Sequence, residues 1–553
     1  MMEKIWLHRY QQQVPAEINV DVYPSLNALF KEACQKFHAL PALSFFQHTI
    51  SYRQWAELSQ SLAAYLQQQF GLKKGTKIAL MLPNCPQYMI AIFAVLQAGL
   101  VVTNINPLYT APEFIQQANH SEAEALIILR NYLPNIAHVI KETKIKQVIS
   151  THLGDMLTWP QSWLVNVSAW WLIKNQQQKD KTVLAIDFLQ ALKIGRNLKL
   201  KPVAVGKEDL AFLQYTGGTT GIPKGAMLSH GNMLANIEQL ITWVRPVLKE
   251  GRESFITALP LYHIFSLMVN GLMCLRLGGK NCLIADARNL KQVIQLLETS
   301  QFSVLLGVNT LFKALLSQTA FLKLDFSSLK VALGGGAPLP AQLKSHWKQV
   351  TGKLLLEGYG LTEASPVVCA PPWDLVVAGD HVGLPLPATD IRLCDDKQQE
   401  VALGEVGELW IKGPQVIKSY WMQPAEVKNA RTADGWLLTG DLARIDSQGF
   451  VFIVGRKKEL ILVSGFNVYP EEIENLLQQH PKVKEVAVIG VRSEKTGEAI
   501  KVFVVGKDKS LSAEELLSYC RRALTGYKLP HQIVFLNKLP KSALGKVLKK
   551  DLY

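Results

Sequence analysis

The chain has 553 residues, of which 48% are apolar and 19% are charged. This composition is typical of a globular protein with a large core and excludes an intrinsically disordered chain. The net charge of +14 favours encounter with anions in general, so nucleotides and anionic lipids both stay open. Nucleic acid is disfavoured, because the sequence has no zinc-finger spacing and no aromatic RNA-binding pattern.

The cysteines and the apolar runs indicate a cellular compartment. Seven cysteines are scattered along the chain and none forms a CxxC pair, which points to a reducing cytosol rather than a disulfide framework. Residues 1–10 do not resemble a signal peptide. The most apolar run, residues 88–102, is too short to span a bilayer and predicts a buried helix that leads into a strand. We therefore expect a cytoplasmic protein, and a peripheral contact with the inner face of the membrane stays open.

Helical and strand patterns alternate through the first four hundred residues. Ser25 is placed as the N-cap of a helix whose apolar face runs from Leu26 to Phe37. Short buried strands are predicted further along, with helical stretches between them, and such alternation indicates an α/β fold. These strands are expected at residues 77–82, 126–129, 302–306 and 331–333.

The pattern changes near residue 455. A helix is predicted to start at Pro470, two strands follow it, and Ser512 with Glu515 has the spacing of a capping box before a further helix. We therefore divide the chain into a large N-terminal α/β domain of several subdomains, residues 1–455, and a small C-terminal α+β domain, residues 456–553.

One loop has an unusual density of glycine and hydroxyl residues, and it follows a strand-like run. Glycines let the backbone approach an anion closely, hydroxyls donate hydrogen bonds, and lysine adds a positive charge. These features predict a phosphate-binding loop, with an ordinary surface loop as the alternative; the order of residues differs from the Walker motif. The loop contains Tyr215, Thr216, Gly217, Gly218, Thr219, Thr220, Gly221, Ile222, Pro223, Lys224 and Gly225.

This loop resembles the phosphate loop of the adenylate-forming superfamily, which includes acyl-CoA synthetases, adenylation domains and luciferases. Other motifs of the superfamily follow in order, and the resemblance covers essentially the whole chain. From residues 6–10 onward it is similar to the bacterial long-chain acyl-CoA synthetases. The resemblance implies a large N-terminal domain that binds AMP and acyl groups, and a small C-terminal domain that moves.

Two further glycine motifs are assigned by this resemblance. The first, which by itself could be a tight turn without a ligand, is implied to bind adenine. In the second, the tyrosine is implied to stack on adenine, Thr362 to contact the α-phosphate, and Glu363 to bind Mg²⁺ together with Thr219; alone, Glu363 would be read as a solvated loop residue. The two motifs comprise Gly334, Gly335, Gly336, Ala337 and Pro338, and Glu357, Gly358, Tyr359 and Gly360.

The ribose is assigned to an acidic residue. An aspartate at the junction of a strand and a loop accepts hydrogen bonds from ribose hydroxyls in other nucleotide-binding folds. The resemblance implies this role for Asp441, helped by Arg456. Gly455 is a departure, since many relatives carry aspartate there; we expect little loss of function from it.

The acyl group is harder to place. The resemblance puts Tyr262 and His263 beside the carboxylate of the substrate, although a histidine in an apolar stretch is more often a core residue. Trp243, on a helix expected over residues 232–243, is considered as a gate of the acyl tunnel, with core packing as the alternative.

The C-terminal domain is implied to supply groups for both half-reactions. Lys546 is assigned as the catalyst of adenylation, although a lysine in a basic tail is usually just solvated. A turn formed by Ser464, Gly465 and Phe466 is assigned to CoA, and Lys457 to a hinge on which the domain rotates between the steps.

The expected activity is that of a long-chain fatty acid–CoA ligase that uses ATP, CoA and Mg²⁺ and proceeds through an acyl-adenylate. Three alternatives stay open: transfer of the acyl group to a carrier protein, a preference for medium-chain or aromatic acids, and a non-catalytic sensor. The sequence does not fix chain length or oligomeric state, and a homodimer is one option. Tryptophans 163, 170 and 171 precede a basic run, residues 174–201, that is expected either to contact anionic lipid or to be a solvated connector.

Overall fold

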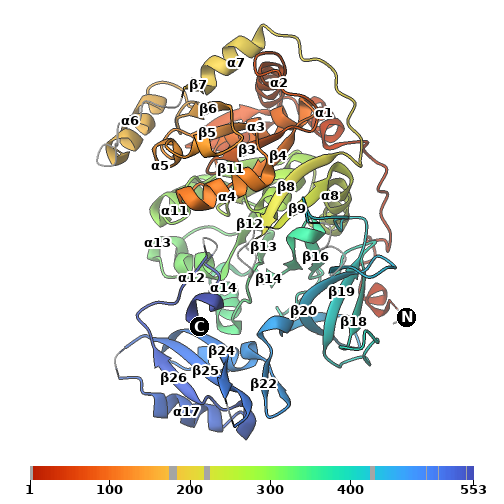
Figure 1. Cartoon of the computed structure of the whole chain (residues 1–553), viewed down its shortest axis with the longest axis vertical. Helices are drawn as coiled ribbons and strands as arrows, with labels where there is room; N and C mark the ends of the chain where they lie inside the picture. The colour runs from red at the N-terminus through yellow and green to blue at the C-terminus, as the bar shows by residue number, and fades with distance from the viewer. Residues whose placement is uncertain are drawn as a thin grey trace.

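The computed structural model describes residues 4–173, 184–216, 224–423, 430–493, 495–508, 510–542 and 545–553, and only the backbone of residues 168–173 and of Thr216. Two seven-stranded sheets and their helices form the large N-terminal part, and the chain ends in a smaller α+β unit (Figure 1). The predicted α/β class is confirmed.

The first sheet has the strand order β7-β6-β5-β3-β4-β8-β9. Its strands are parallel except at the edge, where β9 runs antiparallel to β8. The strands of this sheet are mostly buried, as expected for a parallel sheet with both faces covered. They are β3 (Lys77–Met81), β4 (Val101–Asn104), β5 (Ala125–Leu129), β6 (Gln147–Thr151), β7 (Ala185–Asp187), β8 (Leu210–Thr216) and β9 (Lys224–Ser229).

The second sheet has the order β14-β13-β12-β10-β11-β1-β2, and only β2 is antiparallel to its neighbour. The carboxyl ends of its parallel strands therefore share one edge, where open α/β sheets bind their ligands. The strands are β1 (Pro41–Phe45), β2 (His48–Ser51), β10 (Ser254–Thr257), β11 (Lys280–Leu283), β12 (Val304–Gly307), β13 (Val331–Gly334) and β14 (Leu355–Glu357).

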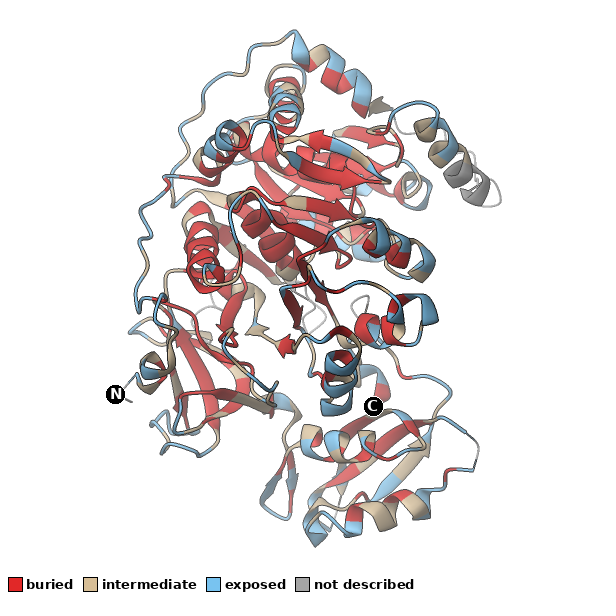
Figure 2. Ribbon diagram, turned by 180° about the vertical axis from the view of Figure 1, so that it is seen from behind, coloured by how far each residue is buried: buried red, intermediate tan, exposed pale blue. Residues whose placement is uncertain are grey.

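Helices cover these sheets, and the strands between them are largely buried (Figure 2). Helix α1 starts at the predicted N-cap Ser25, whose hydroxyl accepts from the Ala28 N–H. The longer helices are α1 (Leu26–Lys36), α2 (Tyr52–Gln68), α3 (Pro86–Gln97), α4 (Ala111–Ser121), α6 (Gln161–Ile173), α7 (Phe188–Arg196), α8 (His230–Val244), α11 (Leu290–Thr299), α12 (Asn309–Leu316) and α14 (Ala341–Thr351).

Shorter helical turns lie in the connections. They are α5 (Leu133–Ile136), α9 (Ile264–Ser266), α10 (Cys274–Arg276), α13 (Thr319–Leu322), the π-helical turn η3 (Leu267–Met273), and the 3-10 turns η1 (Ile5–Arg9), η2 (Ile140–Glu142) and η4 (Thr362–Ala364).

Helix α3 links the two sheets. It contacts β1 of one sheet and β3 and β4 of the other, and its side chains are buried on every face. The NH₂ group of its polar Gln87 donates to Thr151 Oγ1 and to the His152 carbonyl oxygen. A helix that is apolar all round is expected only where no face meets water. The prediction that residues 88–102 are a buried helix leading into a strand is thus confirmed.

Two antiparallel sheets follow the second parallel sheet. One is small and includes β15 (Tyr359–Gly360), β16 (Val367–Ala370) and β17 (Leu384–Pro385). The other has the order β18-β19-β20-β21, with β18 (Asp390–Cys394), β19 (Gly407–Lys412), β20 (Leu437–Ile445) and β21 (Val451–Arg456).

The C-terminal unit has its own sheet and its own hydrophobic core. The change from one sheet to the other occurs between Arg456 and Ile461, beside the predicted domain boundary at 455 and 456, whose position stays a prediction. The elements are η5 (Lys457–Glu459), β22 (Ile461–Val463), β23 (Phe466–Val468), α16 (Pro470–Gln478), β24 (Val483–Ser493), β25 (Gly497–Gly506), α17 (Ala513–Arg521), η6 (Gly526–Lys528), β26 (Gln532–Phe535) and η7 (Lys549–Leu552).

The predicted capping box at Ser512 is only half present. The Ser512 hydroxyl accepts from the backbone N–H of Glu515 at 3.1 Å, as expected. The Glu515 carboxylate, however, lies against Lys482 at 3.1 Å and His480 at 3.5 Å. An ammonium is a stronger partner than a backbone N–H, so the side chain turns away from the cap.

No helix among the described residues is long and apolar enough to cross a membrane.

Candidate active site

The two glycine motifs of the second sheet lie side by side. Strands β13 and β14 are parallel neighbours that pair Gly334 with Glu357, and the Gly358 N–H donates to the Gly334 carbonyl oxygen. Gly336 has a φ of +80°, which favours glycine, and nothing lies within 4 Å of the place its Cβ would take. The turn that the sequence assigned to adenine is therefore open on one side, at the carboxyl edge of the sheet.

Glu357, the last residue of β14, has a structural role beside this turn. Its carboxylate accepts from Lys344 Nζ at 3.0 Å and from the Leu339 N–H at 3.1 Å, and so closes the loop that follows Pro338. Burial raises the pKa of Glu357, and the positive charge of Lys344 opposes that shift. These contacts turn the side chain inward. The contribution of Glu357 and Ala337 to nucleotide binding stays a prediction.

A buried carboxylate lies next to the second motif. Asp441, on β20, is 3% exposed; Tyr359 Oη donates to its Oδ2 at 2.5 Å, and Arg456 Nε lies 2.6 Å from its Oδ1. Burial raises the pKa of Asp441, while Arg456 and Tyr359 pull it back. Each carboxylate oxygen has a second lone pair, so the pair of oxygens can still accept from two ligand hydroxyls.

Lys546 of the C-terminal unit lies within electrostatic range of this carboxylate. Nearby protein atoms displace water from the Lys546 ammonium and so lower its pKa, and the positive charge of Arg456 lowers it further. Glu459 and Asp441 oppose the shift. The backbone beside it is close to the large domain, because a Cβ on Gly545 would lie 3.1 Å from Thr310 Oγ1 on α12. The C-terminal tail thus reaches the N-terminal part, below helices α12 and α14 (Figure 1).

Thr362 and Glu363 lie on the turn η4, next to the second glycine motif. The Glu363 carboxylate accepts from Tyr420 Oη at 2.7 Å. The described part of the chain contains no group of three or more His, Cys, Asp or Glu side chains suited to a metal. A single carboxylate nevertheless fits Mg²⁺, which proteins usually hold through one or two carboxylates plus the phosphates of a substrate.

The phosphate loop lies mostly outside the described residues. The predicted roles of five residues therefore lie outside the described part of the chain, namely those of Gly217, Gly218, Thr219, Thr220 and Gly221.

The phosphate loop lies between strands β8 and β9. Strands β8 and β9 pair antiparallel, with Thr216 opposite Lys224 and Tyr215 opposite Gly225. Tyr215 Oη lies 2.8 Å from His120 Nδ1, which ties the base of the hairpin to helix α4. Lys224 therefore stands at one end of the loop, where an anion in the loop would meet its charge.

The residues assigned to the acyl group differ in setting. Tyr262 is partly buried, and its carbonyl oxygen accepts from Gln214 Nε2. His263 keeps some contact with solvent, yet the protein crowds it enough to lower its pKa to about 4, so the ring is neutral at physiological pH. An uncharged ring suits a site for an acyl chain better than an imidazolium would.

Trp243 is 1% exposed, and its indole N–H donates to the Pro371 carbonyl oxygen at 3.0 Å. Its ring meets the edge of Tyr10 with centroids 5.3 Å apart. These contacts are those of core packing, the alternative left open for this residue. A gating role stays a prediction without a contact that supports it.

The residues assigned to CoA and to the hinge lie in the connection that leads from β21 to β23. Ser464 and Gly465 form a turn with φ of 49° and 84° between β22 and β23, and Phe466 is 55% exposed and stacks on Tyr527. This turn faces away from the β13–β14 edge (Figure 1). Lys457 is anchored to the large domain, with Nζ 2.9 Å from Glu408 Oε2.

Sequence reasoning missed Tyr420. It lies in a segment without a recognisable motif, and its role depends on a contact with Glu363, 57 residues earlier.

Comparison with known proteins agrees with this geometry. The model of the AMP-binding enzyme family matches residues 30–421, and that of its C-terminal domain matches residues 472–546. The long-chain-fatty-acid–CoA ligase of Salmonella typhimurium is 48% identical over 100% of this chain and 98% of its own length, and that of Bacillus subtilis is 35% identical over the same shares. A feruloyl-CoA synthase of an Amycolatopsis species is 32% identical over 90% of this chain and 93% of its own length.

Solved structures show the same fold. An ATP-bound MatB from Rhodopseudomonas palustris has a TM-score of 0.81 at 27% identity, with 96% of this chain and 98% of that chain covered. An anthranilate CoA ligase in complex with anthranoyl-AMP has a TM-score of 0.83 at 22% identity, with 97% and 98% covered, which supports the fold alone. The resemblance drawn from the motifs is confirmed: the chain belongs to the AMP-binding enzyme family.

Proposed function

We propose that the chain is a long-chain fatty acid–CoA ligase that activates its acid as an acyl-adenylate. One observation carries the proposal: the backbone beside Lys546 lies close to Thr310 of the large domain, and the Lys546 ammonium is within electrostatic reach of Asp441 and Arg456. Full-length relatives that bear the name of this activity support the choice of substrate.

The first step forms the mixed anhydride. An oxygen of the fatty carboxylate attacks the α-phosphorus of ATP, the bond from this phosphorus to the bridging oxygen breaks, and pyrophosphate leaves. Negative charge builds up on the α-phosphoryl oxygens in the transition state, and the positive charge of Lys546 stabilises it. Asp441 accepts from the ribose and Tyr359 lies against the adenine, so the phosphorus is held in position for the attack.

Mg²⁺ is part of this proposal. Glu363 offers a carboxylate whose orientation is fixed by Tyr420, and Thr219 is the second candidate ligand from the sequence. When bound, the ion neutralises charge on the phosphates and on the departing pyrophosphate. Lys224, at the end of the phosphate loop, adds a second positive charge there.

The second step forms the thioester. The CoA sulfur attacks the acyl carbon, the bond from this carbon to the phosphate oxygen breaks, AMP leaves, and the thiol proton is released. The turn assigned to CoA, Ser464 to Phe466, lies away from the site while Lys546 is docked. We therefore propose that the C-terminal domain rotates about Lys457 between the steps.

A peripheral contact with lipid is the finer part of the proposal. Trp159, Trp163 and Leu164 are 83%, 59% and 56% exposed beside and along α6. The predicted patch also includes residues outside the described side chains, namely Trp170, Trp171, Lys174, Lys179 and Lys181, and the basic residues Lys193, Arg196, Lys199 and Lys201 follow. Exposed aromatic rings next to a basic run favour anionic lipid. We expect the protein to co-sediment with anionic vesicles and not with neutral ones. Equal binding to both kinds of vesicle would exclude an electrostatic contribution to the lipid contact.

The activity is tested by AMP release across a series of acids, from acetate to oleate and including an aromatic acid, with and without CoA. We expect CoA-dependent turnover that is fastest with long chains. Faster turnover with ferulate than with oleate would overturn the substrate assignment, and it would place the chain nearer to the feruloyl-CoA synthase it resembles.

A further inference from the structure

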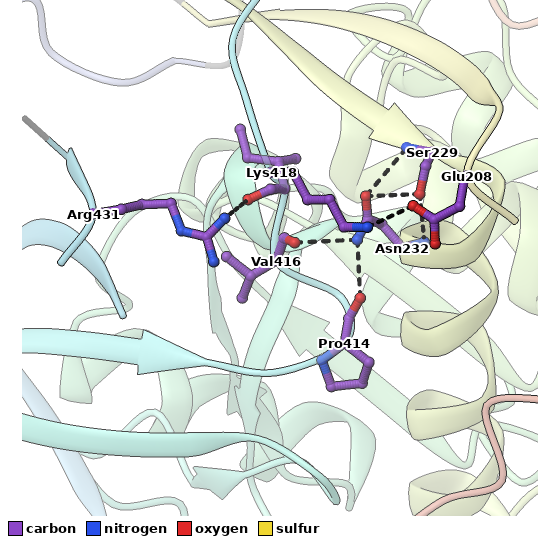
Figure 3. Close-up of polar contacts among 8 residues, drawn as sticks. Glu208, Ser229, Asn232, Pro414, Val416, Lys418 and Arg431 are labelled. Atoms are coloured by element: carbon purple, nitrogen blue, oxygen red, sulfur yellow. Dashed lines mark hydrogen bonds and ion pairs between the residues drawn. The ribbon is translucent and has the colours of Figure 1, made fainter. Parts of the chain in front are cut away.

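The segment from Pro414 to Trp421 connects β19 to the remainder of the large domain, and it is attached to helix α8. The side-chain amide of Asn232, on the first turn of α8, donates to the carbonyl oxygens of Pro414 at 2.9 Å and Val416 at 3.1 Å (Figure 3). Ser229, the N-cap of this helix, accepts from the Asn232 N–H at 3.1 Å. The amide of Asn232 is thereby held toward the segment.

Two charged side chains add to this attachment. Arg431 Nη1 donates to the Ile417 carbonyl oxygen at 3.0 Å, and Lys418 pairs with Glu208 at 2.5 Å (Figure 3). The Lys418–Glu208 pair is exposed and contributes little. The amide and guanidinium contacts with carbonyl groups therefore do most to fix the path of the segment.

The far end of the segment extends the first sheet. The Trp421 N–H donates to the Gly225 carbonyl oxygen at 2.8 Å, and the Met227 N–H donates to the Ser419 carbonyl oxygen at 3.2 Å. These contacts lie on β9, the strand that leaves the phosphate loop. The segment and strand β9 thus form one hydrogen-bonded unit.

Glu363 is held by this unit through both its backbone and its side chain. The Ile417 N–H donates to the Glu363 carbonyl oxygen at 2.9 Å, and Tyr420 Oη donates to Glu363 Oε1 at 2.7 Å. Tyr420 is 8% exposed, so water competes weakly for this bond. One carboxylate oxygen is occupied by the hydroxyl, and the orientation of the other is fixed relative to strand β9.

We propose that Tyr420 is a positioning residue that orients the Glu363 carboxylate for Mg²⁺ bound with ATP. The inference rests on the proposed role of Glu363 as a metal ligand. Mg²⁺ demands a nearly ideal octahedron at short distances, so a carboxylate that rotates freely binds it less well. Hydrogen bonds to ligating carboxylates typically change metal affinity by about 10–100-fold when they are removed.

The variant Tyr420→Phe tests this inference, because it removes the hydroxyl and keeps the ring. Tyr52→Phe is the matched control: Tyr52 is 1% exposed, and its hydroxyl donates to the Gly279 carbonyl oxygen at 2.8 Å, away from the motifs of the site. Binding of Mn²⁺, as a paramagnetic substitute for Mg²⁺, is measured by electron paramagnetic resonance with a non-hydrolysable ATP analogue. The Mg²⁺ concentration for half-maximal ATP–pyrophosphate exchange is measured in parallel.

We expect Tyr420→Phe to weaken Mn²⁺ binding about 10-fold, to raise the half-maximal Mg²⁺ concentration by a similar factor, and to leave the rate at saturating Mg²⁺ within a few-fold of the parent. Tyr52→Phe should leave both metal measurements unchanged. Equal Mn²⁺ affinity in Tyr420→Phe and the parent would overturn the inference and leave Tyr420 as a packing residue.

A third variant, Glu363→Gln, separates the inference from the proposal beneath it. Weaker Mn²⁺ binding in Glu363→Gln together with unchanged binding in Tyr420→Phe overturns only the positioning role. Unchanged Mn²⁺ binding in Glu363→Gln removes the metal role of Glu363 and the inference with it, while ATP-dependent acyl-adenylate formation can still be observed.

Discussion

Asp441 and Arg456 face each other across the β20–β21 pair, and Arg456 Nε lies 2.6 Å from Asp441 Oδ1. The two residues are 15 positions apart in sequence, and the antiparallel pairing of β20 with β21 puts their opposite charges side by side. Arg456 is also the last residue of β21, directly before Lys457, the residue proposed as the hinge. The proposed ribose site and the proposed hinge are therefore built from one hairpin.

The variant Asp441→Asn should weaken ATP binding. An amide offers one acceptor instead of two and leaves Arg456 without its counter-charge; hydrogen bonds to charged groups contribute about 1.5–3 kcal/mol each. We expect the KM for ATP to rise about 10–100-fold, with a smaller change in the KM for the fatty acid. Asp446→Asn, at the exposed turn after the same strand, is the control. An unchanged KM for ATP would count against the ribose assignment.

Lys546→Ala should separate the two half-reactions. Loss of one group that stabilises transition-state charge typically costs about 10²–10³ in rate, so adenylation should fall by at least that factor. Thioester formation from supplied acyl-adenylate and CoA should stay within a few-fold of the parent. Lys550→Ala, an exposed neighbour on η7, controls for the loss of a positive charge. An equal loss in both half-reactions would contradict the assignment of Lys546 to adenylation.

His230 should make the fold sensitive to acid. It is 1% exposed, its Nδ1 accepts from the Leu26 N–H at 3.2 Å, and burial lowers its pKa to about 4, with Asp209 opposing the shift. Because the folded-state pKa is below that of the unfolded chain, about 6.5, this contribution to stability is complete above pH 6.5. It is lost as the pH falls from 6.5 toward 4, by up to about 3 kcal/mol.

The variant His230→Asn keeps an acceptor for the Leu26 N–H and removes the titration. The decline of the thermal unfolding midpoint between pH 6.5 and 4 should therefore be shallower in the variant than in the parent chain. Parallel curves for the two proteins would exclude His230 as a source of the acid sensitivity.

Gly360→Ala should displace the turn that carries Thr362 and Glu363. A Cβ at this position would lie 2.2 Å from the Pro366 carbonyl oxygen, which is backbone and cannot rotate away. We expect a loss of stability of about 1–3 kcal/mol and a larger loss of adenylation. Gly206→Ala is the matched control, because nothing lies within 4 Å of its Cβ position. A fully active Gly360→Ala enzyme would show that the turn tolerates a shift.

The sequence predicted well those features that depend on local patterns. Ser25 predicted the start of α1, and the acidic first turn after Pro470 predicted α16. The apolar run before Gln97 predicted a buried helix. Each of these follows from hydrogen bonding or burial within a few residues.

Features that depend on partners far apart in sequence were not predictable in the same way. The side chain of Glu515 contacts Lys482 and His480, in another part of the C-terminal unit, instead of the predicted cap at Ser512. Tyr420 was missed because its partner, Glu363, is brought to it by the fold alone. Asp441, Arg456 and Lys546 were found through family motifs, and no period or spacing in the sequence places them together.

The most direct test of the account is a single-turnover experiment without CoA. Purified protein is mixed with radiolabelled palmitate, ATP and Mg²⁺, quenched with acid, and examined for palmitoyl-adenylate. The account predicts that the mixed anhydride accumulates in an amount close to that of the enzyme, and that it is converted into palmitoyl-CoA when CoA is added. Absence of an adenylate from palmitate and from every other acid offered would contradict it.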